Sequence, residues 1–272
     1  MIYLKSYCYS KHELPFIISN LIEGFEFIDY LVLYEYNYTH CGCSKNYELE
    51  SILHLIPEEL QSKLIYKKID LTNVIEYAYN DEDLIHKINE PIMRSYFFND
   101  DSIHLNDNDI IIDHDIDEII YKDCYLKLIN ELSIKNKPLS IKLNQFFYKQ
   151  NYLWTDCKFS SPSIYKYCMV KNINTNIKGL YIKHNRDLID KTNNIYGAHM
   201  SWIMSPEYMI KKLHSYSHPK YRKYADINIL NNAIINKQYI FDLNRAFNID
   251  ELNIDDIRIP TYLQTNNIFE YL

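Results

Sequence analysis

The sequence predicts an α/β fold: a single domain with a Rossmann-like mixed central sheet flanked by helices. Strand-like and helix-like segments alternate over the first 148 residues, the order that produces βαβ units. The chain of 272 residues is 47% hydrophobic, which is enough for a sizeable core. No linker, internal repeat or low-complexity tract interrupts it. We therefore expect one domain over residues 1–272.

The first 70 residues contain four segments with local signals. Residues 13–24 mix apolar and polar positions at helical spacing, and Gly24 can end that helix. The apolar run 27–34 is typical of a strand. A short helix is expected over 57–64, and a strand over 64–69 that we take as the second of the sheet.

The middle of the chain continues the alternation. A helix is expected over 81–98, with Asp81 as its N-cap. The run 110–112 is three consecutive isoleucines and is typical of a buried strand. A helix over 123–132 and a strand over 139–148 follow.

The remaining residues give weaker signals. We expect several short strand-like or loop pieces over 151–185, and a helix over 207–214 with Pro206 near its first turn. The tract 243–254 is expected to be rich in loops.

One run of acids carries most of the functional information. The isoleucine strand ends in Asp113, Asp115 and Asp117, at alternate positions, and Glu118 follows directly. If the extended geometry continues, the three Asp side chains point the same way. Carboxylates that close repel one another unless a cation joins them, and a hard divalent cation with oxygen ligands is the usual solution. Ligands of open α/β sheets bind at the carboxyl ends of strands, so we expect a metal site here.

Three other interpretations of this run are possible from its pattern. A solvated acidic turn after a strand is common, because short motifs match by chance. A calcium loop of EF-hand type starting at Asp113 needs a Gly at its sixth position and a Glu at its twelfth, where this chain has Glu118 and Cys124. A phosphatase motif of the haloacid dehalogenase type, D-x-D-x-[T/V], matches only in part and lies mid-chain instead of near the N-terminus.

Composition narrows the class of protein. The net charge of −7 argues against a protein that holds nucleic acid through its phosphates, yet it leaves room for a nucleotide-sugar substrate. The six cysteines show no zinc-ligand spacing and are expected to be free thiols in a reducing compartment. No signal peptide and no run of roughly 20 apolar residues is seen. We expect a soluble, cytoplasmic protein without a membrane span; the sequence does not indicate its oligomeric state.

Several segments, in order along the chain, match the motifs of a known family. Residues 27–42, F-I-D-Y-L-V-L-Y-E-Y-N-Y-T-H-C-G, resemble a strand followed by E-S-N-x-T-x-x-G. Residues 109–119 resemble a strand ending in D-x-D-E-I, and residues 197–202, G-A-H-M-S-W, resemble G-W-H-x-S-[F/W]. Residues 216–218 read Y-S-H. Together these segments resemble glycosyltransferase family 17, which includes the β-1,4-mannosyl-glycoprotein 4-β-N-acetylglucosaminyltransferases.

The resemblance implies a fold, a reaction and two substrates. The fold is a GT-A-like domain with a nucleotide-binding half at about 1–120 and an acceptor-side half at about 121–272. The reaction is metal-dependent inverting transfer of a sugar, GlcNAc in the family named, from a UDP-sugar to a hydroxyl of a glycan or glycoprotein, with Mn²⁺ or Mg²⁺ as the cofactor. A hydrolase of nucleotide sugars and an inactive glycan-binding relative are the alternatives.

The resemblance also implies metal ligands, and inverting transfer needs a catalytic base. Asp117 is expected to ligate the metal directly, and Asp115 to contact ribose or a metal-bound water. His218 is a candidate third ligand, although a surface His after a helix fits its spacing equally well. Glu207 is the first candidate base and Glu118 the second. The simpler role of Glu207 is to stabilise a helix N-terminus.

The expected donor-binding residues fall into three groups. The first group ends a predicted strand and is expected to contact the nucleoside: Glu35, Asn37 and Thr39. The second group is basic and is expected to contact the diphosphate: Arg94 and Lys212. The third group follows a later motif and is expected to line the sugar site: His199, Ser201 and Trp202. Turn hydrogen bonds, a surface salt bridge and core packing are the simpler alternatives for the three groups in turn.

Overall fold

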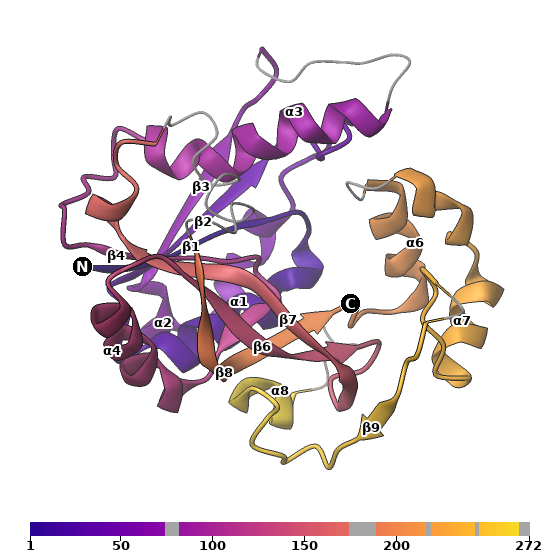
Figure 1. Cartoon of the computed structure of the whole chain (residues 1–272). Helices are drawn as coiled ribbons and strands as arrows, with labels where there is room; N and C mark the ends of the chain where they lie inside the picture. The colour runs from indigo at the N-terminus through magenta and orange to yellow at the C-terminus, as the bar shows by residue number, and fades with distance from the viewer. Residues whose placement is uncertain (74–81, 174–188, 216–218, 243–244, 267–272) are drawn as a thin grey trace.

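The computed structural model describes residues 1–73, 82–173, 189–215, 219–242 and 245–266 (Figure 1). Its core is one mixed sheet, to which both halves of the chain contribute strands. The strands of the described residues follow the order β3-β2-β1-β4-β7-β6-β8-β5, and β9 pairs with β7. They are β1 Ile2–Cys8, β2 Tyr30–Tyr36, β3 Leu64–Ile69, β4 Ile110–Asp113, β5 Glu118–Ile120, β6 Leu139–Phe147, β7 Tyr152–Lys166, β8 Asp190–Ser201 and β9 Ile249–Glu251.

The sheet has a parallel part and a mixed part. β1 lies between β2 and β4, and β3 lies outside β2, all four running parallel. β7 runs antiparallel to both β4 and β6, while β6 and β8 are parallel. The carboxyl ends of β1, β2 and β4 therefore lie along one edge, which is where open α/β sheets bind ligands. This is the predicted α/β class with a mixed central sheet.

The sheet curls strongly between β4 and β5. These two strands stand far apart in the strand order, because β5 pairs with β8 at the far end. Only residues 114–117 separate them in the chain. The acidic turn therefore spans from the parallel part of the sheet to its β8 edge.

Helices cover both faces of the sheet (Figure 1). Alternate residues of β1 and β2 explain the two layers. Leu4, Leu31 and Leu33 pack with α1, α2 and α4 in one core cluster. Tyr3, Tyr7, Val32, Tyr34 and Tyr36 pack with α3 and the 3₁₀ turn after it in a second cluster. These helices are α1 Leu14–Gly24, α2 Glu58–Gln61, α3 Glu82–Ser95 and α4 Tyr125–Lys135, with 3₁₀ turns at Lys11–Glu13 and Tyr96–Asn99.

A third cluster holds α6 and α7 against the mixed part of the sheet. Phe147, Trp154 and Trp202 pack with Met209 and Leu213 of α6. In Figure 1 these helices form a lobe to the right of the sheet. The remaining helices are α6 Pro206–Ser215, α7 Ile227–Ile235 and α8 Thr261–Thr265. None of the described helices is long and apolar enough to cross a membrane.

Most predicted elements of the first half are confirmed. The strand over 64–69 has the predicted bounds, although it is an edge strand, and the predicted helix 123–132 and strand 139–148 correspond to α4 and β6. The strand expected over 27–34 lies at 30–36. The N-cap Asp81 lies outside the described residues.

One prediction for the strands was wrong, and one central strand was missed. The region expected to hold short pieces from residue 151 begins with β7, one strand of 15 residues. The central strand β1 was not predicted at all, because polar Lys5 and Ser6 interrupt its apolar residues.

Candidate functional site

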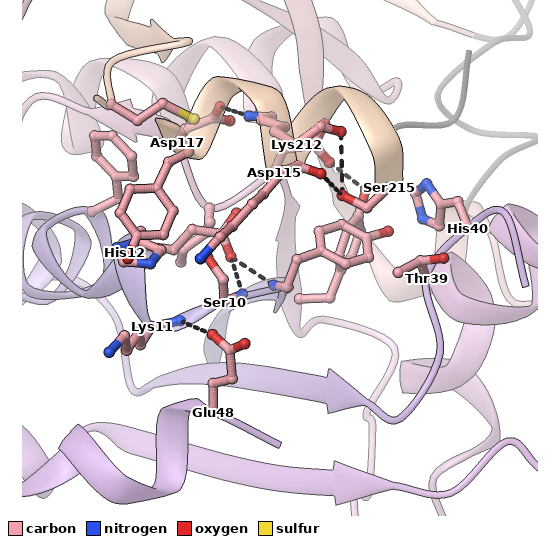
Figure 2. A pocket seen from close by; sticks show the side chains of 18 of the residues that line it. Ser10, Lys11, His12, Thr39, His40, Glu48, Asp115, Asp117, Lys212 and Ser215 are labelled. Atoms are coloured by element: carbon pink, nitrogen blue, oxygen red, sulfur yellow. Dashed lines mark hydrogen bonds and ion pairs between the residues drawn. The ribbon is translucent and has the colours of Figure 1, made fainter. Parts of the chain in front are cut away.

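A cavity of about 1160 Å³ opens at the carboxyl edge of the parallel strands (Figure 2). Its wall combines segments that are far apart in the sequence. It is lined from β1 onward by Tyr7, Tyr9 and Ser10 to Glu13; after β2 by Thr39, His40, Lys45, Tyr47 and Glu48; by Glu90 and Arg94 of α3; by Asp115 to Asp117; by Phe159 and Ser161; and by His199, Ser201, Trp202, Tyr208, Lys211, Lys212 and Ser215.

The acidic turn is held in place by hydrogen bonds from three directions. The backbone N–H of Asp115 donates to Oε2 of Glu118 at 2.7 Å, and the N–H of Glu118 donates back to the Asp115 carbonyl at 2.9 Å. The side-chain amide of Asn20 in α1 donates to the Ile116 carbonyl at 2.9 Å. On the β8 side, the N–H of Met200 donates to the Asp117 carbonyl at 2.8 Å. The turn is thus a rigid part of the cavity wall.

The three Asp side chains do not share one direction. The extended geometry ends at Asp113, and residues 116 and 117 form a turn. Asp113 meets Lys5 at 2.8 Å inside the protein, whereas Asp115 and Asp117 line the cavity. The expectation of three parallel carboxylates is therefore wrong in this structure, because the strand stops before the second acid.

Asp115 is held by an arginine. The Arg94 guanidinium approaches both its oxygens, with Nη1 to Oδ1 at 2.7 Å and Nη2 to Oδ2 at 3.4 Å. The hydroxyl of Tyr7 donates to the same Oδ1 at 3.0 Å. Nε of Arg94 donates to Glu90 at 2.6 Å. This bidentate pairing fixes the guanidinium in the wall and balances the negative charge of Asp115.

Asp117 has a looser environment. Lys212 Nζ lies 3.8 Å from Oδ2, the contact that Figure 2 marks between these residues, and His199 Nε2 lies 3.7 Å from Oδ1. Both distances exceed those of a hydrogen bond. The other ring nitrogen of His199 lies 2.8 Å from Gln145 Oε1, which directs Nε2 toward Asp117. Lys212 also lies over the ring of Trp202, at 5.2 Å from its centroid.

The positions of these side chains limit how a divalent cation could be held. Among the described residues no group of three or more His, Cys, Asp or Glu side chains is arranged to hold a metal. The expected third ligand His218 lies outside the described residues. Mg²⁺ in phosphate sites needs only one or two carboxylates, the substrate phosphates and water. Asp117 fits that donor set, since Lys212 and His199 both lie beyond hydrogen-bond distance from it; Asp115 is less suited, because Arg94 already contacts both its oxygens.

Besides Asp117, seven residues that the sequence analysis assigned to the site line the cavity. Thr39 accepts a hydrogen bond from the Cys43 N–H at 3.2 Å and shapes the loop after β2. Trp202 has a φ of 57°, a left-handed backbone that bulky residues rarely adopt, directly after β8. The seven are Thr39, Arg94, Asp115, His199, Ser201, Trp202 and Lys212, and with Asp117 they form one wall.

Two residues predicted to contact the nucleoside face away from the cavity. Glu35 is fully buried and accepts hydrogen bonds from the Tyr66 hydroxyl at 2.6 Å and the Glu48 N–H at 2.7 Å. Lys45 Nζ lies 3.1 Å from it. Asn37 bonds to Asp70 at 2.7 Å. Both therefore hold neighbouring loops, including the segment that carries Tyr47 into the cavity wall, and neither lines the cavity among the described residues.

Both predicted bases also lie outside the lining. Glu118 is fully buried, and its Oε2 fastens the acidic turn as described. Glu207 is exposed in the first turn of α6, where its own backbone N–H and the Ser205 hydroxyl lower the pKa of the carboxyl. A lowered pKa makes a weaker proton acceptor, so this environment favours the helix-terminus role of Glu207.

Sequence reasoning missed Glu13. It lies at the start of α1, and its Oε2 accepts hydrogen bonds from the Tyr9 N–H at 2.6 Å and the Ser10 N–H at 3.4 Å. Burial, opposed by the Lys212 charge, raises the pKa of Glu13 to about 7. The only sequence signal was the S-x-x-E spacing of Ser10 and Glu13, which indicates a capping box and says nothing about a cavity.

Sequence reasoning also missed an aromatic wall of the cavity, formed by Tyr7, Tyr9 and His40 next to Asp115 and Thr39. The rings of Tyr9 and His40 meet edge to face at 5.0 Å, and Tyr7 lies 5.4 Å from Tyr9. Such flat surfaces suit the face of a base or a sugar.

Comparison of the chain with known proteins gives no matching family model and no matching curated protein. The resemblance to glycosyltransferase family 17 therefore stays an interpretation of the sequence motifs.

Proposed function

We propose that the protein is a metal-dependent inverting glycosyltransferase that moves a sugar, GlcNAc by the resemblance, from a UDP-sugar to a hydroxyl of a glycan or glycoprotein. One observation carries the proposal. Asp117 lies between Lys212 and His199 in a large cavity at the carboxyl edge of the parallel strands. That edge is the usual ligand position of open α/β sheets.

The charges of the wall suit a nucleoside diphosphate. Lys212 comes from α6, and Arg94 comes from α3 on the other side of the acidic turn. Arg94 is already balanced by Asp115 and Glu90, so it acts mainly as a fixed hydrogen-bond donor. Lys212 lies over the Trp202 ring and 3.8 Å from Asp117, too far for a hydrogen bond to the carboxylate, and can turn toward a phosphate. A cation held by Asp117 would neutralise the charge that develops on the departing diphosphate.

The size of the cavity supports two substrates together. Pockets for one small ligand span about 300–1,000 Å³, and this cavity has about 1160 Å³. The aromatic wall of Tyr7, Tyr9 and His40 lies at the β1–β2 side, and His199, Ser201 and Trp202 lie at the β8 side. We assign the nucleoside to the former and the transferred sugar to the latter.

Calorimetry against UDP- and GDP-sugars, with Mn²⁺, with Mg²⁺ and with chelator, tests the proposal. We expect one sugar nucleotide to bind only with metal, and Asp117→Asn to lose that metal-dependent gain. Transfer to a glycan acceptor supports a transferase. Donor hydrolysis that no acceptor diverts selects the hydrolase instead, and glycan binding without metal-dependent donor binding selects the inactive relative.

A further inference from the structure

We propose that Glu13 accepts the proton of the attacking acceptor hydroxyl. The inference rests on the proposed function and adds the residue that performs its proton transfer. Figure 2 shows the segment Ser10 to His12, immediately before Glu13, facing the acidic turn and Lys212 across the cavity. Glu13 itself belongs to the lining.

The cavity's other carboxylates are engaged differently. Glu90 and Asp115 pair with Arg94 at 2.6 and 2.7 Å, and Asp117 faces Lys212 and His199 within 3.8 Å. A carboxylate paired with a cation is a weaker proton acceptor, because the cation stabilises the ionised form. Glu48 lies at the rim, where it is exposed to solvent and one of its oxygens accepts a hydrogen bond from the Lys11 N–H at 3.3 Å. Glu13 combines partial burial with a place in the wall.

The local geometry leaves part of the Glu13 carboxylate for a substrate. The hydrogen bonds from the Tyr9 and Ser10 N–H groups both reach Oε2. They fix the side chain at the first turn before α1, as a capping box does. A carboxylate held by one oxygen is oriented in advance, which a base needs because proton transfer requires hydrogen-bond distance.

The electrostatic surroundings support the role. Burial raises the pKa of Glu13 to about 7, against the opposing charge of Lys212 on α6 and with a further rise from Asp117 on the acidic turn. On the same turn as Glu13, burial lowers the pKa of His12 to about 4, so that imidazole is neutral near pH 7. A base with a pKa near the working pH transfers protons most effectively.

The chemical step balances with one base. The acceptor oxygen forms a bond to the anomeric carbon, and the bond from that carbon to the diphosphate oxygen breaks, its electron pair leaving with the diphosphate. The hydroxyl proton passes to Glu13. A single displacement of this kind inverts the anomeric configuration, in agreement with the proposed reaction.

Glu13→Gln is the informative variant. Gln keeps an oxygen for the Tyr9 and Ser10 N–H groups, so the turn before α1 is preserved, while the amide cannot take a proton. With UDP-GlcNAc, Mn²⁺ and a mannose-terminated oligosaccharide, we expect transfer to fall by about 10²–10⁴-fold. Metal-dependent donor binding, measured by calorimetry, should stay within about threefold of the wild-type protein.

Azide, used as the acceptor in place of a hydroxyl, distinguishes a catalytic base from a residue that has only a structural role. Azide attacks without losing a proton, so Glu13→Gln should form the β-configured glycosyl azide at a rate within about threefold of wild type. Glu59→Gln, an exposed change on α2 outside the cavity, is the matched control and should transfer normally to both acceptors. Loss of azide transfer in parallel with hydroxyl transfer would overturn the inference.

Two other results would decide whether Glu13 is the base and whether the proposed function holds. If Glu13→Gln keeps hydroxyl transfer within about threefold, or if Glu48→Gln shows the azide-rescued loss instead, Glu13 is not the base while the proposed function stands. If the wild-type protein transfers from no sugar nucleotide, the proposed function fails, and the inference fails with it.

Discussion

Lys5 and Asp113 form an ion pair inside the protein, with 2.8 Å between Nζ and Oδ2. They lie opposite one another in the register of β1 and β4, and their side chains are only 2% and 7% exposed. The first acid of the run is therefore a structural partner of β1. The two later acids lie beyond the end of β4 and face the cavity.

This difference predicts opposite effects for two similar substitutions. Asp113→Ala leaves the Lys5 ammonium buried without its carboxylate, which should lower the free energy of unfolding by about 3–5 kcal/mol. Asp117→Ala removes only contacts at 3.7 and 3.8 Å and should cost about 1 kcal/mol or less, while it abolishes metal-dependent donor binding. Urea denaturation and calorimetry measure the two effects.

The double variant Lys5→Met, Asp113→Leu provides the control. Replacing both charges by apolar groups should recover most of the lost stability, since neither charge then remains buried alone. Equal destabilisation by Asp113→Ala and Asp117→Ala would contradict the division of roles between the two acids.

A second prediction concerns the close contact of β5 and β8 at Gly197. A Cβ on Gly197 would lie 2.1 Å from the carbonyl oxygen of Ile119, a backbone atom that cannot move independently of its strand. Gly197→Ala should therefore destabilise the protein by about 1–3 kcal/mol, the usual range for overpacking. Because β5 directly follows the acidic turn, donor affinity should fall as well.

Gly24→Ala is the comparison for this change. Its Cβ would come within 3.0 Å of the Tyr125 hydroxyl and 3.1 Å of an Ile28 methyl, both ends of side chains that can shift. We expect a smaller loss in thermal melting and normal donor affinity. A Gly197→Ala protein as stable as wild type would show that β5 and β8 can separate without cost.

A third prediction concerns the fork between Arg94 and its two acids. Arg94→Lys keeps the charge but cannot contact Asp115 twice and Glu90 at the same time. We expect a loss of about 1–2 kcal/mol in the free energy of unfolding and weaker binding of UDP alone. Lys68→Arg in the exposed pair with Glu50 is the matched control and should change neither. Full UDP affinity in Arg94→Lys would remove Arg94 from the diphosphate site.

Local sequence patterns predicted the α/β class because helices and strands such as α4 and β6 bury regular apolar faces. β1 escaped prediction because its polar Lys5 becomes acceptable only beside Asp113, 108 residues later. β7 escaped because its middle holds the exposed charges Asp156 and Lys158 and then the turn-like run 160–163, S-S-P-S, in which the proline argues against a strand. Both strands form because they pair with strands that are distant in the sequence.

The same limit applies to the candidate site. Arg94, Asp117, His199 and Lys212 were predicted and share one cavity wall. Glu35 was predicted to face the nucleoside, but the Tyr66 hydroxyl and the backbone after β2 surround its carboxylate. Glu13 was not predicted, since only the folded chain brings α6 and the acidic turn near it. Residue type indicates which chemistry is possible, whereas the direction of a side chain depends on partners distant in sequence.

The last prediction follows from the raised pKa of Glu13. In the folded, metal-free protein this carboxyl keeps its proton to about pH 7, whereas its ordinary pKa is 4.5. The stability it contributes is therefore fully present below pH 4.5 and is lost as the pH rises through about 7. Relative to Glu13→Gln, the wild-type protein should lose on the order of 2–3 kcal/mol between pH 4.5 and pH 8.

Urea denaturation of both proteins across this range, with chelator present, measures the difference. His12 acts in the opposite direction: its pKa of about 4 means that its contribution is lost as the pH falls from 6.5 toward 4. His12 is present in both proteins, so its effect cancels in the difference between them. Two pH profiles that run parallel would mean that Glu13 titrates as an ordinary carboxyl, and its special basicity in the cavity would be refuted.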